Sequence, residues 1–248
     1  MCYTSDADPP ITRIEGGSSG HEDLTLTTSD GTRFAAFAAN ATTPKGSAVV
    51  ILPDVRGLHG FYTELAERFA EHGRDSVAID YFGRTAGVGR RDDEFPFRDH
   101  VPLCSLEGIT ADTAAAVEYL RRDDPERTVF ALGFCFGGSN AWHMAAQGLG
   151  LAGVIGFYGN PKRPPVGPIE TVDRYACPVL ALMGGDDPGI PVEVVEEFRE
   201  AMDRAGVDNE VVIYEGAPHS FFDRQQEEYA EESADAWRRS LDFIERNS

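Results

Sequence analysis

Short apolar runs alternate with amphipathic segments along most of this 248-residue chain. The runs at 47–53, 128–134 and 177–185 consist mainly of apolar residues, which is typical of strands buried on both faces of a sheet. Segments 60–73 and 191–206 place their apolar residues at helical spacing. Strands that alternate with helices of this length predict an α/β fold with a mainly parallel central sheet and helices on both faces.

The length of the chain suits one large domain, and no shift in composition marks a boundary within it. We expect residues 1–21, rich in Pro, Gly and Ser, to form a loose lead-in, and residues 22–248 to form a single domain. Segment 22–39 predicts a hairpin, because Ser-Asp-Gly at 29–31 is a turn signal. The Pro-rich segment 160–176 is too short for a separate lid, so no large lid domain is expected.

The formal net charge of −20 argues against nucleic acid or an anionic membrane as a partner, because such surfaces would repel the chain. Only two of the 22 basic residues are lysine, Lys45 and Lys162. A GC-rich genome, which favours arginine codons, explains this bias. Adaptation to high salt, where an acidic surface stays soluble, is the alternative explanation. Composition alone leaves both explanations open.

The cysteines at positions 2, 104, 135 and 177 are scattered without CxxC spacing, so neither a zinc site nor a disulfide framework is predicted. No run approaches the roughly 18 apolar residues of a membrane span, and the first residues do not resemble a secretory signal. A reduced, cytoplasmic compartment is therefore the default expectation.

The sequence GFCFGG at 133–138 stands where a predicted strand turns directly into a predicted helix. It matches the nucleophile elbow G-x-S-x-G, with cysteine in the place of serine. Glycines two positions before and after Cys135 relieve the crowding of so abrupt a turn. The turn places the thiol at the positive end of the helix and leaves the N–H of Phe136 free to stabilise an oxyanion. The pattern favours Cys135 as a nucleophile over a structural cysteine in a glycine-rich turn.

Two later segments contain candidates for an acid and a base. In enzymes with a nucleophile elbow, the acid and then the histidine follow the nucleophile along the chain, each after a later strand. Asp186 and Asp187 directly follow a predicted strand, so an aspartate emerges at the C-terminal end of that strand. His219 lies in the loop after the next predicted strand. This placement predicts a Cys-His-Asp triad.

Three motifs, GFCFGG at 133–138, GGDDPGIP at 184–191 and GAPHSFF at 216–222, resemble those of the dienelactone hydrolases, or carboxymethylenebutenolidases, in order and spacing. The resemblance extends over most of the chain and implies an α/β-hydrolase fold. Cysteine in the elbow is its specific part, since most hydrolases of this fold use serine. The family pattern GG-x-D-x-x-x-P implies that Asp187 is the triad acid, and the H-S-F segment implies His219 as general base.

The resemblance also implies roles around the nucleophile. Asp54 falls where the family places a glutamate beside the resting thiol, which implies that Asp54 gates Cys135. The N–H of the next residue, Val55, would complete an oxyanion hole together with that of Phe136.

Two arginines are implied as substrate-binding residues. Arg84 matches an arginine that binds the substrate carboxylate. The family has a second such arginine four residues beyond the histidine, where this chain has Asp223. Arg224, one position further on, is the candidate replacement.

These features predict hydrolysis of an activated, dienelactone-like ester or lactone that carries a carboxylate, through a thioester acyl-enzyme. Two alternatives stay open: a general cysteine-dependent carboxylesterase acting on uncharged esters, and a non-catalytic binding protein on the same fold. The expected partner is a small-molecule substrate, with the chain acting as a monomer or a small homo-oligomer. No metal or organic cofactor is implied.

Overall fold

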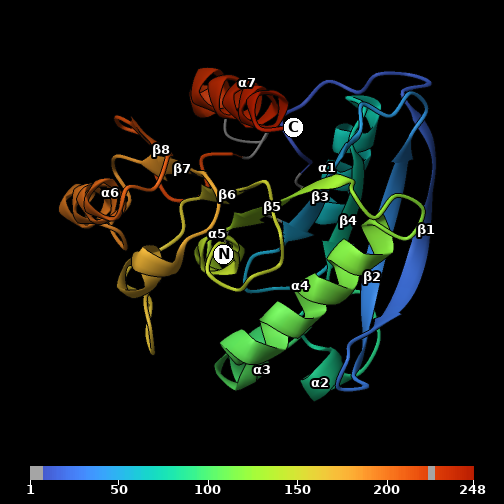
Figure 1. Ribbon diagram of the computed structural model, residues 1–248. Helices are drawn as coiled ribbons and strands as arrows, with labels where there is room; N and C mark the ends of the chain where they lie inside the picture. Colours follow the sequence, from blue (N-terminus) through green and yellow to red (C-terminus); the bar gives the residue numbers. More distant parts are fainter. Residues whose placement is uncertain (1–7, 223–226) are drawn as a thin grey trace.

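The structure, a computed structural model, describes residues 8–222 and 227–248 (Figure 1). Its centre is an eight-stranded sheet in the order β1-β2-β4-β3-β5-β6-β7-β8. Strands β3 to β8 run parallel, whereas the β1–β2 hairpin and the β2–β4 pair are antiparallel. The predicted mainly parallel sheet is therefore confirmed. The strands are β1 (Ser18–Thr27), β2 (Arg33–Ala41), β3 (Ser47–Leu52), β4 (Asp75–Ile79), β5 (Thr128–Phe134), β6 (Gly153–Phe157), β7 (Val179–Gly184) and β8 (Asn209–Tyr214).

The apolar runs of the sequence form the middle of the sheet. Every residue of β3, β6 and β7 is buried, because helices cover both faces of these strands. The hairpin strand β1, at one edge, is mostly exposed, which fits its alternating polar sequence. The order of the strands brings the loops after β3, β5, β6, β7 and β8 to one edge of the sheet, where the candidate residues lie.

Helices form a layer on each face of the sheet (Figure 1). On one face α1 and α7 meet, with the rings of Phe69 and Trp237 4.7 Å apart. On the other face lie α4, α5 and α6, and Trp142 of α5 packs 4.9 Å from Phe198 of α6. The helices are α1 (Gly60–Glu71), α2 (Gly83–Ala86), α3 (Phe97–His100), α4 (Leu106–Leu120), α5 (Phe136–Met144), α6 (Val192–Ala205) and α7 (Ala230–Arg246), with short 3-10 turns at Val101–Leu103, Pro168–Arg174 and Glu227–Tyr229.

Two segments differ from their sequence-based descriptions. The expected loose lead-in extends to residue 21, but β1 already begins at Ser18, which pairs with Ala41 of β2, and the hydroxyls of Ser18 and Ser19 hydrogen-bond to the carbonyl of Asn40. The segment 83–105, expected to be a long loop, contains α2, α3 and a 3-10 turn. The single-domain division stays an expectation.

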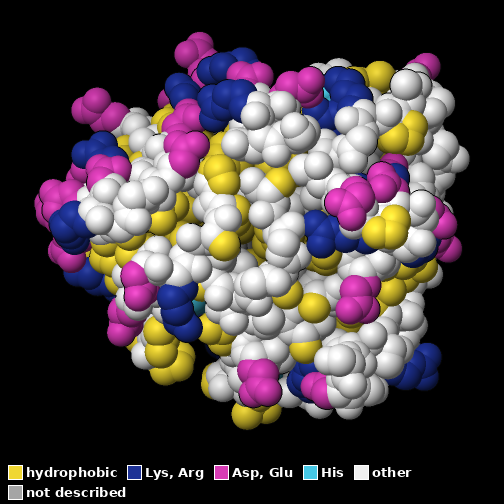
Figure 2. All heavy atoms as spheres, in the orientation of Figure 1, with side chains coloured by type: hydrophobic (Ala, Val, Ile, Leu, Met, Phe, Trp, Pro, Cys, Tyr) yellow, Lys and Arg dark blue, Asp and Glu magenta, His cyan; other side chains and the backbone are white. Residues whose placement is uncertain are grey.

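Acidic and basic side chains intermingle on the face seen in Figure 2, and the basic ones lie among acidic neighbours. Arg239, for example, pairs with both Glu210 and Asp235. Many arginines thus serve the acidic surface as ion-pair partners. Within residues 8–222 and 227–248, none of the helices has the length and apolar character needed to cross a membrane.

Candidate active site

Cys135 is the single residue between β5 and α5, and its backbone is strained, with φ 56° and ψ −111°. The glycines on either side have no room for a side chain. A Cβ on Gly133 would lie 2.0 Å from the carbonyl oxygen of Gly137, and a Cβ on Gly137 would lie 2.0 Å from the carbonyl oxygen of Leu52. The glycine pattern of the sequence is therefore a packing requirement of this turn.

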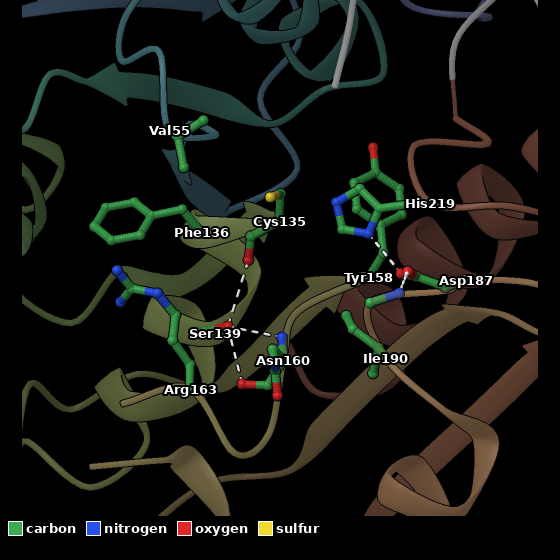
Figure 3. A pocket seen from close by; sticks show the side chains of 11 residues that line it. Val55, Cys135, Phe136, Ser139, Tyr158, Asn160, Arg163, Asp187, Ile190 and His219 are labelled. Carbon is green, nitrogen blue, oxygen red and sulfur yellow. Dashed lines mark hydrogen bonds and ion pairs between the residues drawn. The ribbon is translucent and has the colours of Figure 1, made fainter. Parts of the chain in front are cut away.

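A cavity of about 330 Å³ lies at the C-terminal ends of the parallel strands (Figure 3). This volume is in the range of small-molecule sites. Cys135 and His219 both line it, and Cys135 lies between Phe136 and His219 in Figure 3. The residues that line the cavity come from the loops after five strands and from α5: Val55, Cys135, Phe136, Ser139, Tyr158, Asn160, Arg163, Asp187, Gly189, Ile190 and His219.

The histidine and one of the two candidate aspartates are in contact. Nδ1 of His219 lies 2.5 Å from Oδ2 of Asp187, while Oδ1 of Asp187 accepts the N–H of Gly189 at 2.8 Å. Asp186 is exposed, and its backbone N–H donates to the carbonyl of Ala217 at 2.9 Å, which ties the acid loop to the histidine loop. The structure brings Asp187, and not Asp186, to His219.

Tyr158 forms the wall behind the histidine, and sequence reasoning missed it. This residue follows β6 directly, has a positive φ of 37° and is fully buried. Its ring centroid lies 4.9 Å from that of His219 (Figure 3). A buried aromatic ring at this distance restricts the orientations that the imidazole can adopt.

The two predicted oxyanion donors lie on the same side of the thiol. Val55 follows β3 and Phe136 is the first residue of α5, and both line the cavity beside Cys135 (Figure 3). Neither backbone N–H donates a hydrogen bond to another described residue. The arrangement can therefore offer two donors to a negatively charged oxygen.

Asp54, the residue before Val55, is fully buried and is not among the residues that line the cavity. One carboxylate oxygen accepts the N–H of Arg56 at 2.8 Å, and Nε2 of His59 lies 3.8 Å away, an ion-pair distance that is too long for a hydrogen bond. Burial alone would raise the pKa of Asp54, but His59 and Arg56 outweigh it and the pKa is lowered. None of these described contacts is with Cys135, so gating by Asp54 stays a prediction.

The structure does not bring Arg84 to the cavity. Its guanidinium lies 2.6 Å from Asp112, a buried residue of α4, and 3.0 Å from Asp30 in the β1–β2 turn. These two carboxylates hold the side chain on α2 and away from Cys135, which corrects the expected position of Arg84. The other predicted arginine, Arg224, lies outside the described residues, as does Asp223.

The arginine that does line the cavity is Arg163, which sequence reasoning missed. It belongs to the loop after β6, between Asn160 and the proline pair 164–165. The signal that could have found it is its position a few residues beyond the C-terminal end of a parallel strand, where α/β folds bind ligands. Within the part of the chain that is described, no three metal-ligating side chains converge on this or any other point.

The profile of the dienelactone hydrolase family matches residues 34–248. The chain belongs to this family. A carboxymethylenebutenolidase from Rhodococcus opacus is 29% identical, with 99% of this chain and 97% of the relative covered. A Bradyrhizobium protein named as a probable 2-oxo-3-(5-oxofuran-2-ylidene)propanoate lactonase is 27% identical, with 86% of this chain and 88% of that protein covered.

A crystal structure from Klebsiella pneumoniae that is assigned to the dienelactone hydrolases has a TM-score of 0.77 and 25% identity to this chain. The comparison covers 91% of this chain and 98% of the other. These relatives confirm the predicted α/β-hydrolase fold, and with the family match they show that this dienelactone hydrolase family member hydrolyses ester or lactone bonds.

Proposed function

We propose that this hydrolase opens an activated lactone or ester by nucleophilic attack of Cys135, with His219 as general base and Asp187 as the acid that orients it. The observation that carries the proposal is the convergence of these three side chains on one cavity, with the 2.5 Å contact between His219 and Asp187. The strained elbow supports the same assignment, because it holds the thiol at the N-terminus of α5, where a thiolate is stabilised.

The reaction begins when His219 removes the proton of the Cys135 thiol. The thiolate attacks the carbonyl carbon, and the carbonyl oxygen becomes an anion that the N–H groups of Val55 and Phe136 stabilise. Donors of this kind contribute about 3–4 kcal/mol each in related enzymes. The intermediate then collapses, the carbon–oxygen bond to the leaving group breaks, and His219 returns its proton to the leaving oxygen. A thioester on Cys135 remains.

Deacylation reverses the roles. A water molecule attacks the thioester carbonyl while His219 takes one of its protons. Collapse of the second tetrahedral intermediate breaks the carbon–sulfur bond, and the proton on His219 restores the thiol. The product acid leaves, and the enzyme regains its initial state.

The nucleophile limits the class of substrate. A thiolate leaves a tetrahedral intermediate more readily than an alkoxide does, so attack by Cys135 succeeds best when the competing leaving group is a good one, such as an enolate. Lactones of enols meet this condition, and amides do not. The names of the relatives from Rhodococcus opacus and Bradyrhizobium, a butenolide hydrolase and an oxofuranylidene lactonase, support an enol lactone.

Two measurements test the proposal. Purified enzyme should hydrolyse an activated aryl ester and an enol lactone but not the corresponding amide, and Cys135→Ala should lose both activities. Mass spectrometry of acid-quenched enzyme should detect an acyl group on the peptide that contains Cys135. Full activity of Cys135→Ala would refute the mechanism. Absence of hydrolysis of either substrate by the wild-type enzyme would favour the non-catalytic binding protein instead.

A further inference from the structure

Arg163 contributes a positive charge to the wall of the cavity. Its guanidinium carbon lies 4.1 Å from the centroid of the Phe136 ring, the residue that follows the nucleophile. Among the described residues no carboxylate pairs with it, in contrast to Arg84, which is held by two. In a chain of net charge −20, an arginine in the substrate cavity without an acidic partner has donor capacity left for a ligand.

The loop that carries Arg163 is anchored to the helix that begins at the nucleophile. Oγ of Ser139 accepts the N–H of Asn160 at 2.8 Å and lies 3.1 Å from its carbonyl oxygen. At the other end of the loop, Nε2 of His143 lies 3.1 Å from the carbonyl oxygen of Val166. Both anchors, Ser139 and His143, belong to α5, so the backbone of the loop that carries Arg163 is tied to the helix that begins beside Cys135.

The contact with Phe136 leaves N–H donors of the Arg163 guanidinium available. The guanidinium carbon lies over the Phe136 ring in a cation–π contact, and a guanidinium has five N–H donors, more than one ring contact can occupy. Figure 3 shows Cys135 between His219 on one side and Phe136 with Arg163 on the other. A substrate whose carbonyl meets the thiol can therefore extend an anionic group toward Arg163 without obstructing His219.

We propose that Arg163 binds a carboxylate of the substrate and makes this enzyme selective for anionic lactones or esters. The inference rests on the proposed function, since it assigns one wall of the same cavity. A guanidinium offers a carboxylate two parallel charge-assisted hydrogen bonds, which strengthen in a sheltered site. Burial lowers the pKa of Arg163, and the negative charge of the Cys135 thiolate opposes that effect. A bound carboxylate would likewise raise the pKa of Arg163 and stabilise its charged form.

The competing role for Arg163 is to stabilise the Cys135 thiolate itself. The two roles differ in what they require of the substrate. Loss of a carboxylate-binding group weakens the binding of anionic substrates only. Loss of a thiolate-stabilising group slows the reaction with every substrate and shifts the acidic limb of the pH–rate profile toward higher pH.

A pair of substrates that differ only in charge separates these roles. 4-Nitrophenyl hydrogen adipate carries a free carboxylate, and its methyl ester is the uncharged equivalent with the same leaving group. In Arg163→Gln we expect KM for the anionic ester to rise about 10- to 100-fold, the loss expected for one or two charge-assisted hydrogen bonds. We expect KM and kcat for the methyl ester to stay within about twofold, because its neutral end makes no such bond.

Two variants serve as controls. Lys162→Gln removes the same charge from the neighbouring position, where Lys162 is exposed and pairs with Glu197, and should leave the ratio of the two KM values unchanged. Arg84→Gln tests the arginine that the sequence favoured. If Arg84→Gln raises KM for the anionic ester alone, the carboxylate is bound there and the inference for Arg163 is overturned.

The remaining outcomes are equally decisive. Equal losses on both esters in Arg163→Gln, or a displaced pH–rate profile, would overturn the inference in favour of a role at the thiolate. Unchanged kinetics on both would overturn it as well. None of these results affects the nucleophile assignment, which fails only if Cys135→Ala remains active. Arg163→Lys keeps the positive charge but lacks the paired N–H donors of a guanidinium. It should therefore retain more selectivity for the anionic ester than Arg163→Gln does.

Discussion

Replacement of Asp187 by asparagine tests the triad geometry, because the surrounding hydrogen bonds determine how the amide must lie. Oδ1 of Asp187 accepts the N–H of Gly189 at 2.8 Å, and Oδ2 faces Nδ1 of His219 at 2.5 Å. In Asp187→Asn the amide oxygen is needed by Gly189, so the NH₂ group faces Nδ1. Nδ1 must then accept a hydrogen bond, and the ring proton moves to Nε2. His219 in this tautomer can no longer take a proton toward the substrate.

The two half-reactions should lose different amounts of rate. A thiol of ordinary pKa, about 8.5, is still roughly 3% ionised at pH 7, so loss of the base slows acylation by only about 30-fold. Deacylation has no comparable alternative, because a water molecule attacks the thioester efficiently only when a base takes its proton. It should slow by about 10⁴-fold, as in the best-known serine triad, or about 5.5 kcal/mol at 1.36 kcal/mol per tenfold change. The thioester should therefore accumulate in the variant.

Stopped-flow hydrolysis of an activated aryl ester measures both steps. Asp187→Asn should show a burst of about one equivalent of leaving group, followed by very slow turnover. Asp186→Asn is the matched control: Asp186 is exposed and contributes its backbone N–H to the loop, so the rate should change by no more than about twofold. A kcat of Asp187→Asn within tenfold of wild type, or greater damage from Asp186→Asn, would refute the reasoning.

Three further predictions concern other parts of the molecule. Iodoacetamide should inactivate the enzyme by labelling Cys135 before Cys104 or Cys177, since burial raises the pKa of both of those thiols to about 11; peptide mapping checks this. Burial lowers the pKa of His143 to about 4, from 6.5, so the folded state resists protonation that the unfolded chain accepts. The contribution of His143 to stability should therefore fall by about 3 kcal/mol as the pH drops from 6.5 to 4, so the stability of the wild type relative to His143→Gln should decline by that amount; urea unfolding of both proteins at several pH values measures it. Finally, self-repulsion at a net charge of −20 predicts a melting midpoint that rises between dilute buffer and 1 M salt, and a constant midpoint would favour codon bias as the origin of the acidic composition.

The sequence predicted best those features that the backbone dictates. The glycines at 133 and 137 leave no space for a Cβ, so the elbow could be identified from residue types alone. The buried strands β3 and β7 were equally plain, because nearly all of their residues are apolar. Asp187 and His219 follow strand ends, and their positions relative to Cys135 are consequences of the parallel sheet.

Long side chains were the weak point of the prediction. An arginine can reach several ångströms in many directions, so its position along the chain does not say where its charge lies. Arg84 follows β4 by a few residues, but buried Asp112 in the distant helix α4 holds its guanidinium away from the cavity. Arg163 reaches the cavity because Ser139 and His143 anchor its loop, and contacts of this kind, between segments more than 20 residues apart, leave no local signal.

The acidic composition and the proposed selectivity for anions act over different distances. At physiological ionic strength the Debye length is about 8 Å, so an approaching carboxylate meets the net negative charge only near the surface. Inside the cavity the nearest described charge at the Phe136 wall is that of Arg163, and water screens it less there than at the surface. An anion that enters thus exchanges a weak, screened repulsion for a strong local attraction. Selectivity for an anionic substrate is therefore compatible with a chain of net charge −20, provided that the arginine in the cavity keeps its charge free of acidic partners.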